Sequence, residues 1–310
     1  MKPNLRRFIL WLVLPVLLLA LAMWSWRPHE PTWEGRTLGS WLKDLEPDIG
    51  KKLGGVGEQK TAAATIAIQA MGTNCLPFLL QRLGLSQPTP WERMLINLEE
   101  QFGKRGVKLA WGNTEMQLQL QALATMSAIE ALGQQAAPAV PELHRWLNQT
   151  NGHKDALAAQ SLGRIHPQGT SVLTTESTNR LIPNRDWVFF ALSQAAVHHS
   201  EALAVLLRSA DDADPHVRRF AGQYLCHHAR EASVVLPVLI RLLADPDGSV
   251  RKITLASLNR FKGDLTAAVP ALTTLEADLD PWTSSQAKSL LQKTKSQSSG
   301  SPAAALVTPP

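Results

Sequence analysis

An internal repeat constrains this chain more than any other feature. The segment Asp214-Pro215-His216-Val217-Arg218 returns as Asp247-Gly248-Ser249-Val250-Arg251, and Asp280-Pro281-Trp282 begins a third copy at the same interval. We call this constant spacing, from Asp214 to Asp247 to Asp280, the repeat interval. Periods of roughly 20–50 residues with helical content are typical of a solenoid, in which each repeat contacts only its neighbours. The spacing therefore predicts an architecture and leaves the chemistry open. Further residues at the repeat interval are Leu225, Leu258 and Leu291, and Pro237 and Pro270.

A second periodic signal extends the repeat through the chain from residue 60. Each predicted helix carries a small or apolar residue and, four positions later, a Leu or Met, and these two positions share one helix face. A small residue on that face lets the next helix approach closely. We therefore predict an all-α, right-handed α-solenoid of about seven helical hairpins, the last one half present. The pairs are Ala67/Met71, Ala128/Leu132, Ala158/Leu162, Val188/Leu192, Ala221/Leu225, Thr254/Leu258 and Ala287/Leu291.

Composition and spacing divide the chain into four parts. Residues 1–32 are predicted to be an N-terminal membrane anchor (or signal peptide) and a spacer, and residues 33–59 a capping helix and a Gly-rich loop. The solenoid is predicted over residues 60–293, with an insertion at 85–116 that interrupts the repeat. The tail, 294–310, is rich in small and polar residues, so we predict that it is disordered.

The N-terminal segment is apolar and long enough to cross a membrane. Lys2, Arg6 and Arg7 precede residues 8–26, a stretch without a charge that spans the roughly 30 Å hydrocarbon core as a helix. The basic flank favours a cytoplasmic N-terminus, which predicts a single-pass inner-membrane protein with a periplasmic solenoid. In the alternative, cleavage of a signal peptide between Ala22 and Met23 would release the domain as an exported soluble protein.

The junctions between predicted helices resemble those of HEAT repeats. Residues 71–77 and 131–143 look like HEAT helix–turn–helix junctions, and Asp-Pro-x-Val-Arg at 214–218 is similar to the segment that opens many bacterial HEAT units. The start at 33–42 is similar to that of membrane-anchored HEAT-repeat proteins found in Verrucomicrobia-like bacteria. The resemblance covers roughly residues 60–293 and implies a fold, while it brings no established activity.

The sequence carries no motif that requires an active site. It lacks a Gly-x-Ser-x-Gly elbow, a Walker loop and a dinucleotide-binding fingerprint. His198-His199 and His227-His228 are adjacent pairs, whose rings point about 100° apart on a helix and do not chelate one ion as an i, i+4 pair does. We therefore expect no catalytic residue, no cofactor and no metal site. The alternative is a HEAT-fold enzyme of the lyase or metal-dependent hydroxylase type.

The insertion at 85–116 is the first candidate for binding a partner. Insertions into a solenoid lie on one face of it, and that face is often the binding face. The alternative is a helix that only covers apolar surface. The candidate partner-binding residues within the insertion are Trp91, Lys104, Arg105, Lys108 and Trp111.

The strongest polar columns are acidic and basic residues one repeat apart. We predict that Asp214, Asp247 and Asp280 form a structural ladder with Arg218 and Arg251, in which an Asp of one repeat pairs with an Arg of the next. The functional alternative is a basic patch for an anionic partner, and Arg219 and Lys252 are its further candidate residues.

These observations together predict a non-catalytic, membrane-anchored scaffold. Its solenoid surface would bind a protein or peptide partner, and the protein would be monomeric. The net charge of +5 makes nucleic acid a conceivable partner, but export conflicts with it, so we expect no nucleic-acid binding. A HEAT-fold enzyme and, after it, a nucleic-acid-binding HEAT protein are the alternatives.

Overall fold

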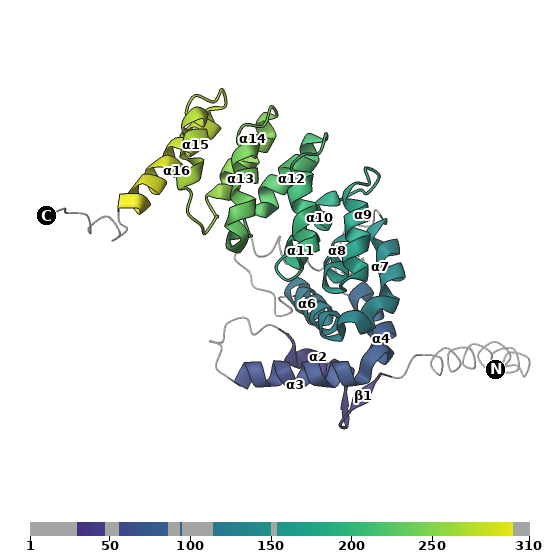
Figure 1. The fold of residues 1–310 in the computed structure, drawn as a ribbon. Helices are drawn as coiled ribbons and strands as arrows, with labels where there is room; N and C mark the ends of the chain where they lie inside the picture. The colour runs from purple at the N-terminus through teal and green to yellow at the C-terminus, as the bar shows by residue number, and fades with distance from the viewer. Residues whose placement is uncertain (1–29, 47–55, 86–93, 95–113, 150–153, 300–310) are drawn as a thin grey trace, which may run out of the picture. The chain divides into compact units, whose positions relative to one another are not determined.

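The computed structural model describes residues 30–46, 56–85, 94, 114–149 and 154–299, and Figure 1 shows their course. The chain divides into two compact units, Met1–Gln135 and Ala136–Pro310, which are treated separately below. The predicted anchor at 8–26 and nearly all of the insertion at 85–116 lie outside the described residues.

The first unit opens with a short β-hairpin that the all-α prediction missed. Strands β1 (Thr32–Trp33) and β2 (Arg36–Thr37) are antiparallel, with Trp33 opposite Arg36. Glu34 and Gly35 between them have φ values of 49° and 74°, which is the backbone of a two-residue hairpin turn with both central residues left-handed. The hairpin leads directly into helix α2 (Leu38–Asp44).

Helix α2 forms as the sequence predicts. The side-chain oxygen of Thr37 accepts a hydrogen bond from the Ser40 N–H at 3.4 Å and caps the helix. The apolar side chains at i, i+3 and i+4 spacing are buried, with Leu38 and Leu42 completely inaccessible. This burial confirms the capping helix within residues 33–59.

The first unit continues with a helical hairpin and one long helix. The hairpin consists of α3 (Val56–Met71), the 3₁₀ turn η1 (Gly72–Cys75) and α4 (Leu76–Leu85), and α6 (Thr114–Leu132) packs against both of its helices. Helix α3 thus begins inside the segment that was predicted to end in a loop at residue 59. Gly72 has a φ of 60°, a left-handed conformation that ends α3 without a Cβ clash.

One described stretch, Glu58–Gly84, is apolar and long enough to resemble a membrane span. It is not a continuous helix, because Gly72 and η1 separate α3 from α4. Ile68, Leu79 and Leu83 on these helices are completely buried in the unit. We therefore assign the apolar character of this stretch to packing within a helical hairpin.

The second unit is a row of helices that follow one another along the chain (Figure 1). Helices α8, α10, α12, α14 and α16 form one series in which each packs against the next. The helices are α7 (Val140–Leu147), α8 (Lys154–Arg164), α9 (Gln168–Ser177), α10 (Arg185–Ala195), α11 (Ser200–Ser209), α12 (Pro215–Leu225), α13 (Ala232–Leu242), α14 (Gly248–Leu258), α15 (Val269–Leu275) and α16 (Pro281–Ser299), with 3₁₀ turns η3 (Ala229–Glu231) and η4 (Thr266–Ala268).

The predicted small-then-large pairs are the buried seam of the repeats. The first members of the seven pairs are 0–1% exposed and the second members 0–8% exposed. The pairs lie on α3 and α6 in the first unit and on α8, α10, α12, α14 and α16 in the second. The described residues thus confirm the helical repeat register from α3 to α16.

Close helix contacts explain why small residues are needed. A Cβ added to Gly222 on α12 would lie 2.3 Å from Oγ1 of Thr254 on α14. A Cβ on Gly163 of α8 would lie 3.0 Å from the carbonyl oxygen of Ala191 on α10. Gly163 lies inside α8, where its lack of a side chain allows the close approach.

Two polar segments are more helical than their composition suggests. The polar stretch at 170–183 contains most of helix α9, and Thr170 on it is 2% exposed. The tail predicted to be disordered from residue 294 begins inside α16, which runs to Ser299. Thr294 is 4% exposed, and its hydroxyl donates to the Leu290 carbonyl at 2.9 Å. Such hydroxyl-to-backbone bonds allow a polar residue to be buried in a helix.

Candidate interaction surface

A ladder of arginine–aspartate pairs connects successive repeats of the second unit. Arg218 donates from Nε and Nη2 to the two carboxylate oxygens of Asp245, at 2.7 and 2.9 Å. One repeat later, Nε of Arg251 donates to Asp278 at 2.8 Å. One repeat earlier, Nη2 of Arg185 donates to Asp214, also at 2.8 Å. The ladder therefore exists, and it holds adjacent repeats in register.

The ladder pairing differs from the predicted one. An Asp of one repeat was expected to pair with an Arg of the next, but Arg218 and Arg251 pair with Asp245 and Asp278. Asp247 and Asp280 each cap their own helix. Asp247 accepts the Ser249 N–H at 2.8 Å, and Asp280 accepts the Thr283 N–H at 2.9 Å. A capping carboxylate can still reach the neighbouring repeat, as Asp214 does: it accepts the His216 N–H at 3.0 Å and also pairs with Arg185.

Two of the aspartates that pair with the ladder arginines, Asp245 and Asp278, belong to a column that the sequence analysis missed. With Asp212 they recur at the repeat interval, two positions before the capping aspartates, but Asp212 accepts the Asp214 N–H and Arg185 pairs with Asp214 itself. Burial tends to raise the pKa of Asp245, but hydrogen bonds from Arg218 and the Asp247 N–H outweigh it and hold the pKa below its usual value. The hydrogen bond from Arg251 lowers the pKa of Asp278 in the same way. Both carboxylates are therefore ionised in the folded protein at neutral pH.

Next to the ladder lies a surface that we call the α10–α16 face. It consists of three positions on or just before α10, α12, α14 and α16, each recurring at the repeat interval. Their i, i+3, i+7 spacing puts the three on one side of each helix. All twelve residues are exposed or half-buried. The face is formed by Pro183, His216, Ser249 and Trp282, by Asp186, Arg219, Lys252 and Ser285, and by Phe190, Gln223, Ala256 and Ser289.

The two predicted partner-binding residues of the second unit, Arg219 and Lys252, both lie on this face. Lys252 is already engaged, because its Nζ lies 3.5 Å from the Asp280 carboxylate and 5.0 Å from the Trp282 ring centre. Arg219 stacks 5.4 Å from the Phe220 ring centre, and no carboxylate of the described residues pairs with it. Its Nε is enclosed and has no hydrogen-bond acceptor. One of the two predicted cations is thus available to a partner.

An aromatic cluster at the α10 end of the face was not predicted. Trp187 is 36% exposed and meets Phe190 edge to face at 5.9 Å, and Phe190 meets Tyr224 of α12 at 6.1 Å. The Tyr224 hydroxyl donates to Asp186 at 3.4 Å. Burial, with the nearby Asp186 charge, raises the pKa of Tyr224 far above its usual value, so it stays a donor. These aromatic residues do not recur at the repeat interval, so no periodic signal could have revealed the cluster.

The candidate residues of the insertion cannot be added to this surface. Trp91, Lys104, Arg105, Lys108 and Trp111 all lie outside the described residues. Their role in binding stays a prediction.

Two histidines of the second unit stack on each other, and a third is buried. The rings of His166 and His199 stack at 3.7 Å with an interplanar angle of 8°, and His228 is buried with Nε2 3.3 Å from the Ser193 hydroxyl. Burial, followed by the charges of His166 and His198, lowers the pKa of His199 below its usual value. The part of the chain that the structure describes contains no cluster of three or more His, Cys, Asp or Glu placed to hold a metal.

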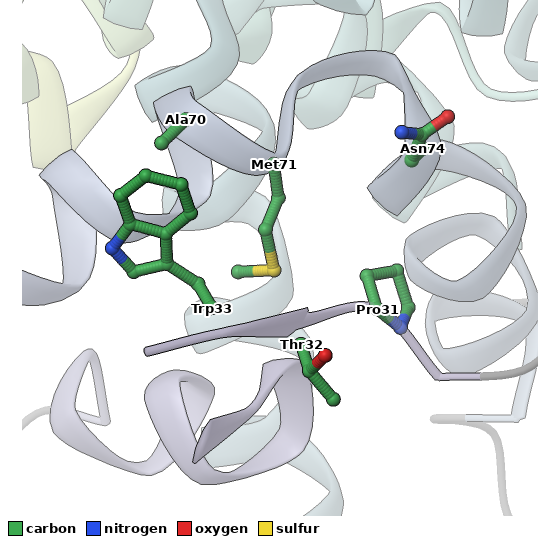
Figure 2. Close-up of a pocket in the computed structure, with 6 residues that line it drawn as sticks. All are labelled: Pro31, Thr32, Trp33, Ala70, Met71 and Asn74. Carbon is green, nitrogen blue, oxygen red and sulfur yellow. The ribbon is translucent and has the colours of Figure 1, made fainter. Parts of the chain in front are cut away.

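A shallow cleft in the first unit is a second candidate contact site. It encloses about 490 Å³ between the β1 segment and the junction of α3 with η1. Figure 2 shows the Trp33 ring and the Met71 side chain bordering the same space, with Pro31 and Asn74 nearer its other end. Its lining combines polar and apolar groups, and no titratable side chain belongs to it. Its lining residues are Pro31, Thr32, Trp33, Ala70, Met71 and Asn74.

Comparison with known proteins gives a result for part of the chain. Residues 200–292, from the start of α11 into α16, match the family model for HEAT repeats, so the chain contains HEAT repeats. No curated protein matches the sequence. Among solved structures, an engineered protein from a structural genomics consortium is similar at a TM-score of 0.35 with 18% identity, over 84% of this chain and 68% of that one. A likeness at this level carries no functional argument.

Proposed function

We propose that this protein is a non-catalytic, membrane-anchored scaffold whose α10–α16 face binds a protein or peptide. The observation that carries the proposal is the combination on one regular face of the exposed Trp282 and the half-buried Phe190 with Arg219, which has no ion-pair partner among the described residues. Aromatic residues and arginine are the types that contribute most to the centre of protein interfaces. HEAT repeats commonly serve as protein-interaction scaffolds.

The Arg–Asp ladder supports this proposal by fixing the face before a partner arrives. Arg218 and Asp245 have side chains only 14% and 5% exposed, and Arg251 and Asp278 are similarly enclosed. Each pair crosses from one repeat to the next, so the spacing of face residues is set by the fold. A surface that needs little ordering on binding loses less free energy to conformational entropy.

The charge pattern favours a protein or peptide over nucleic acid. Along the central positions of the face the charges are negative at Asp186, positive at Arg219, and positive at Lys252, where Asp280 compensates. Binding to a phosphate backbone requires a continuous run of basic side chains. A mixed pattern instead suits a polypeptide with its own alternating groups, and in this proposal the protein binds it as a monomer without metal or cofactor.

A site-specific crosslinking experiment tests the binding proposal. A photo-crosslinking amino acid replaces Gln223 on the face and, as a matched control, the exposed Glu201 on α11, in cells that produce the full chain. We expect discrete crosslinked products from position 223 and not from position 201. Identical products from both positions, or none from either, would contradict the proposal.

The membrane anchor is the second part of the proposal, supported by residues 8–26 and the basic residues before them. We propose that the N-terminus is cytoplasmic and that a right-handed solenoid lies in the periplasm. Ser289→Cys places an exposed thiol on α16, while the native Cys75 and Cys226 are buried. An impermeant maleimide should label this variant in intact spheroplasts, and labelling only after lysis would contradict export. Mass spectrometry of the N-terminus distinguishes an intact anchor from cleavage before Met23.

A further inference from the structure

Arg219 differs from the basic residues around it because it has no anionic partner among the described residues. Arg218 and Arg251 bind Asp245 and Asp278, and Lys252 lies beside Asp280. A guanidinium group offers five N–H donors, and the Arg219 Nε is enclosed without an acceptor while the ring of Phe220 lies beneath the group. The Nε–H donor therefore has no acceptor within the described part of the chain.

The groups on both sides of Arg219 favour an apolar neighbour. Towards α10 lies the half-buried ring of Phe190, and towards α16 lies Trp282, which is 38% exposed. Neighbouring packed helices are about 8–10 Å apart, so the three steps from α10 to α16 cover roughly 25–30 Å. An extended chain advances about 3.3 Å per residue, so eight or nine residues match this length.

The structure therefore points to the kind of segment that this face binds. We propose that the α10–α16 face takes an extended segment of a partner protein, with an aspartate or glutamate side chain on Arg219 and apolar side chains on Phe190 and Trp282. This inference rests on the proposed function and specifies its partner. Arginine and carboxylate form two parallel hydrogen bonds, which fixes geometry as well as charge.

Asp186 gives the bound segment a defined register. It lies one repeat before Arg219 at the same position of the face, and the Tyr224 hydroxyl is its hydrogen-bond donor. A carboxylate of the partner is repelled by Asp186 and attracted by Arg219, and Lys252 beyond it is already paired with Asp280. The charge order along the face thus places the acidic residue over α12.

The test uses the full chain in detergent and a display library of random nonapeptides, with both peptide ends joined to the carrier so that only side-chain carboxylates are present. Peptides are selected on the wild type and measured against Arg219→Gln. The matched control is Arg208→Gln, which removes an exposed arginine near the end of α11 that donates to the Ala204 carbonyl. Circular dichroism and thermal midpoints show that each variant is folded.

We expect the selected peptides to share an acidic residue flanked by apolar ones. Arg219→Gln should weaken their binding about tenfold or more, Arg208→Gln by less than about twofold, and Arg219→Lys by an intermediate factor because it keeps the charge without the paired donors.

The outcomes separate this inference from the proposed function. Alanine variants of Phe190 and Trp282 show whether the selected peptides bind this face. If the peptides depend on both residues but are not enriched in acidic residues, and Arg219→Gln does not change their affinity, the inference is overturned and the peptide-binding function stands. Failure to select any peptide that depends on the face would overturn both.

Discussion

At residue scale, the contact of Gly222 with Thr254 sets the distance between α12 and α14. We predict that Gly222→Ala destabilises the protein by about 1–3 kcal/mol, because a Cβ would lie 2.3 Å from the threonine Oγ1 and force the helices apart. Gly248→Ala is the control, since the nearest atom to its added Cβ is 3.5 Å away at the end of the flexible Arg251 side chain. Urea denaturation measures both, and equal midpoints for the two variants would contradict the prediction.

Three histidines, His199, His227 and the buried His228, predict a stability loss in mild acid. Burial is the main cause that lowers the pKa of His199, His227 and His228 below the usual value of about 6.5. The unfolded chain therefore binds more protons than the folded one below about pH 6.5, and the free energy of unfolding decreases as the pH falls through that range.

The measurement is the thermal midpoint at pH 7.5 and at pH 5.5 for the wild type and two variants. His228 is 3% exposed, and His228→Gln should make the decrease in thermal midpoint from pH 7.5 to pH 5.5 smaller than in the wild type. His216→Gln removes an exposed imidazole and should keep the loss of the wild type. A wild-type midpoint that is independent of pH over this range would show the prediction to be wrong.

At the scale of helices and loops, the ladder should contribute far more than an exposed ion pair. Arg218→Met leaves the Asp245 carboxylate, 5% exposed, without its cation, and we expect a loss of about 3 kcal/mol or more. The matched control is Arg241→Met, because Arg241 and Asp211 also lie 2.7 Å apart but are 56% and 65% exposed. Removal of an exposed pair costs about 0.5 kcal/mol.

Adding Asp245→Asn to Arg218→Met removes the uncompensated charge, so the double variant should regain part of the lost stability. Denaturant midpoints of the wild type, Arg218→Met, Asp245→Asn and the double variant complete the cycle. If Arg218→Met and Arg241→Met cost the same, the ladder would not have the structural role that its burial indicates.

The helices were predictable from the sequence because their buried residues recur at regular intervals. The small-then-large pairs depend only on helix geometry and on the need of each repeat to cover the next, and every one of them is buried. The ladder partner was not predictable, because Asp245 and Asp247 both recur at the repeat interval and the period cannot distinguish them. Tertiary packing decides between them: Asp247 only caps its helix and Asp245 binds Arg218, whereas one repeat earlier Asp214 both caps α12 and binds Arg185.

The candidate surface was predictable only in part for a similar reason. Arg219 and Lys252 are one repeat apart and were found together on one face. That Lys252 is paired and Arg219 is not depends on Asp280 and Phe220, whose side-chain directions are set by tertiary packing. The cluster of Trp187 and Phe190 occurs on one repeat and leaves no periodic signal.

At the scale of the whole molecule, the net charge of +5 is a poor guide to a partner. Within the second unit the ladder arginines are neutralised by buried aspartates, so they add nothing to an external basic field. In the proposed interface the relevant charge is the local one at Arg219, with Asp186 before it. Local pairing, rather than composition, is therefore the basis on which we propose a polypeptide partner.

A row of repeats in which each contacts only its neighbours should open from its end. Helix α16 packs against α14 and α15, whereas α10 packs against α8, α9, α11 and α12. We therefore expect the backbone amides of α16 to exchange with deuterium faster than those of α10, as measured by mass spectrometry of the folded full chain.

Two variants at equivalent positions sharpen this expectation. Leu291→Ala on α16 and Leu192→Ala on α10 each remove a side chain that is at most 4% exposed, and both create a cavity in the seam. Leu291→Ala should accelerate exchange in α14–α16 only, because the disturbed repeat has no neighbour beyond it among the described residues. Leu192→Ala should accelerate exchange from α8 to α12, since the seam is disturbed on both sides. If both variants accelerated exchange evenly over the whole second unit, it would open as one cooperative domain and not repeat by repeat.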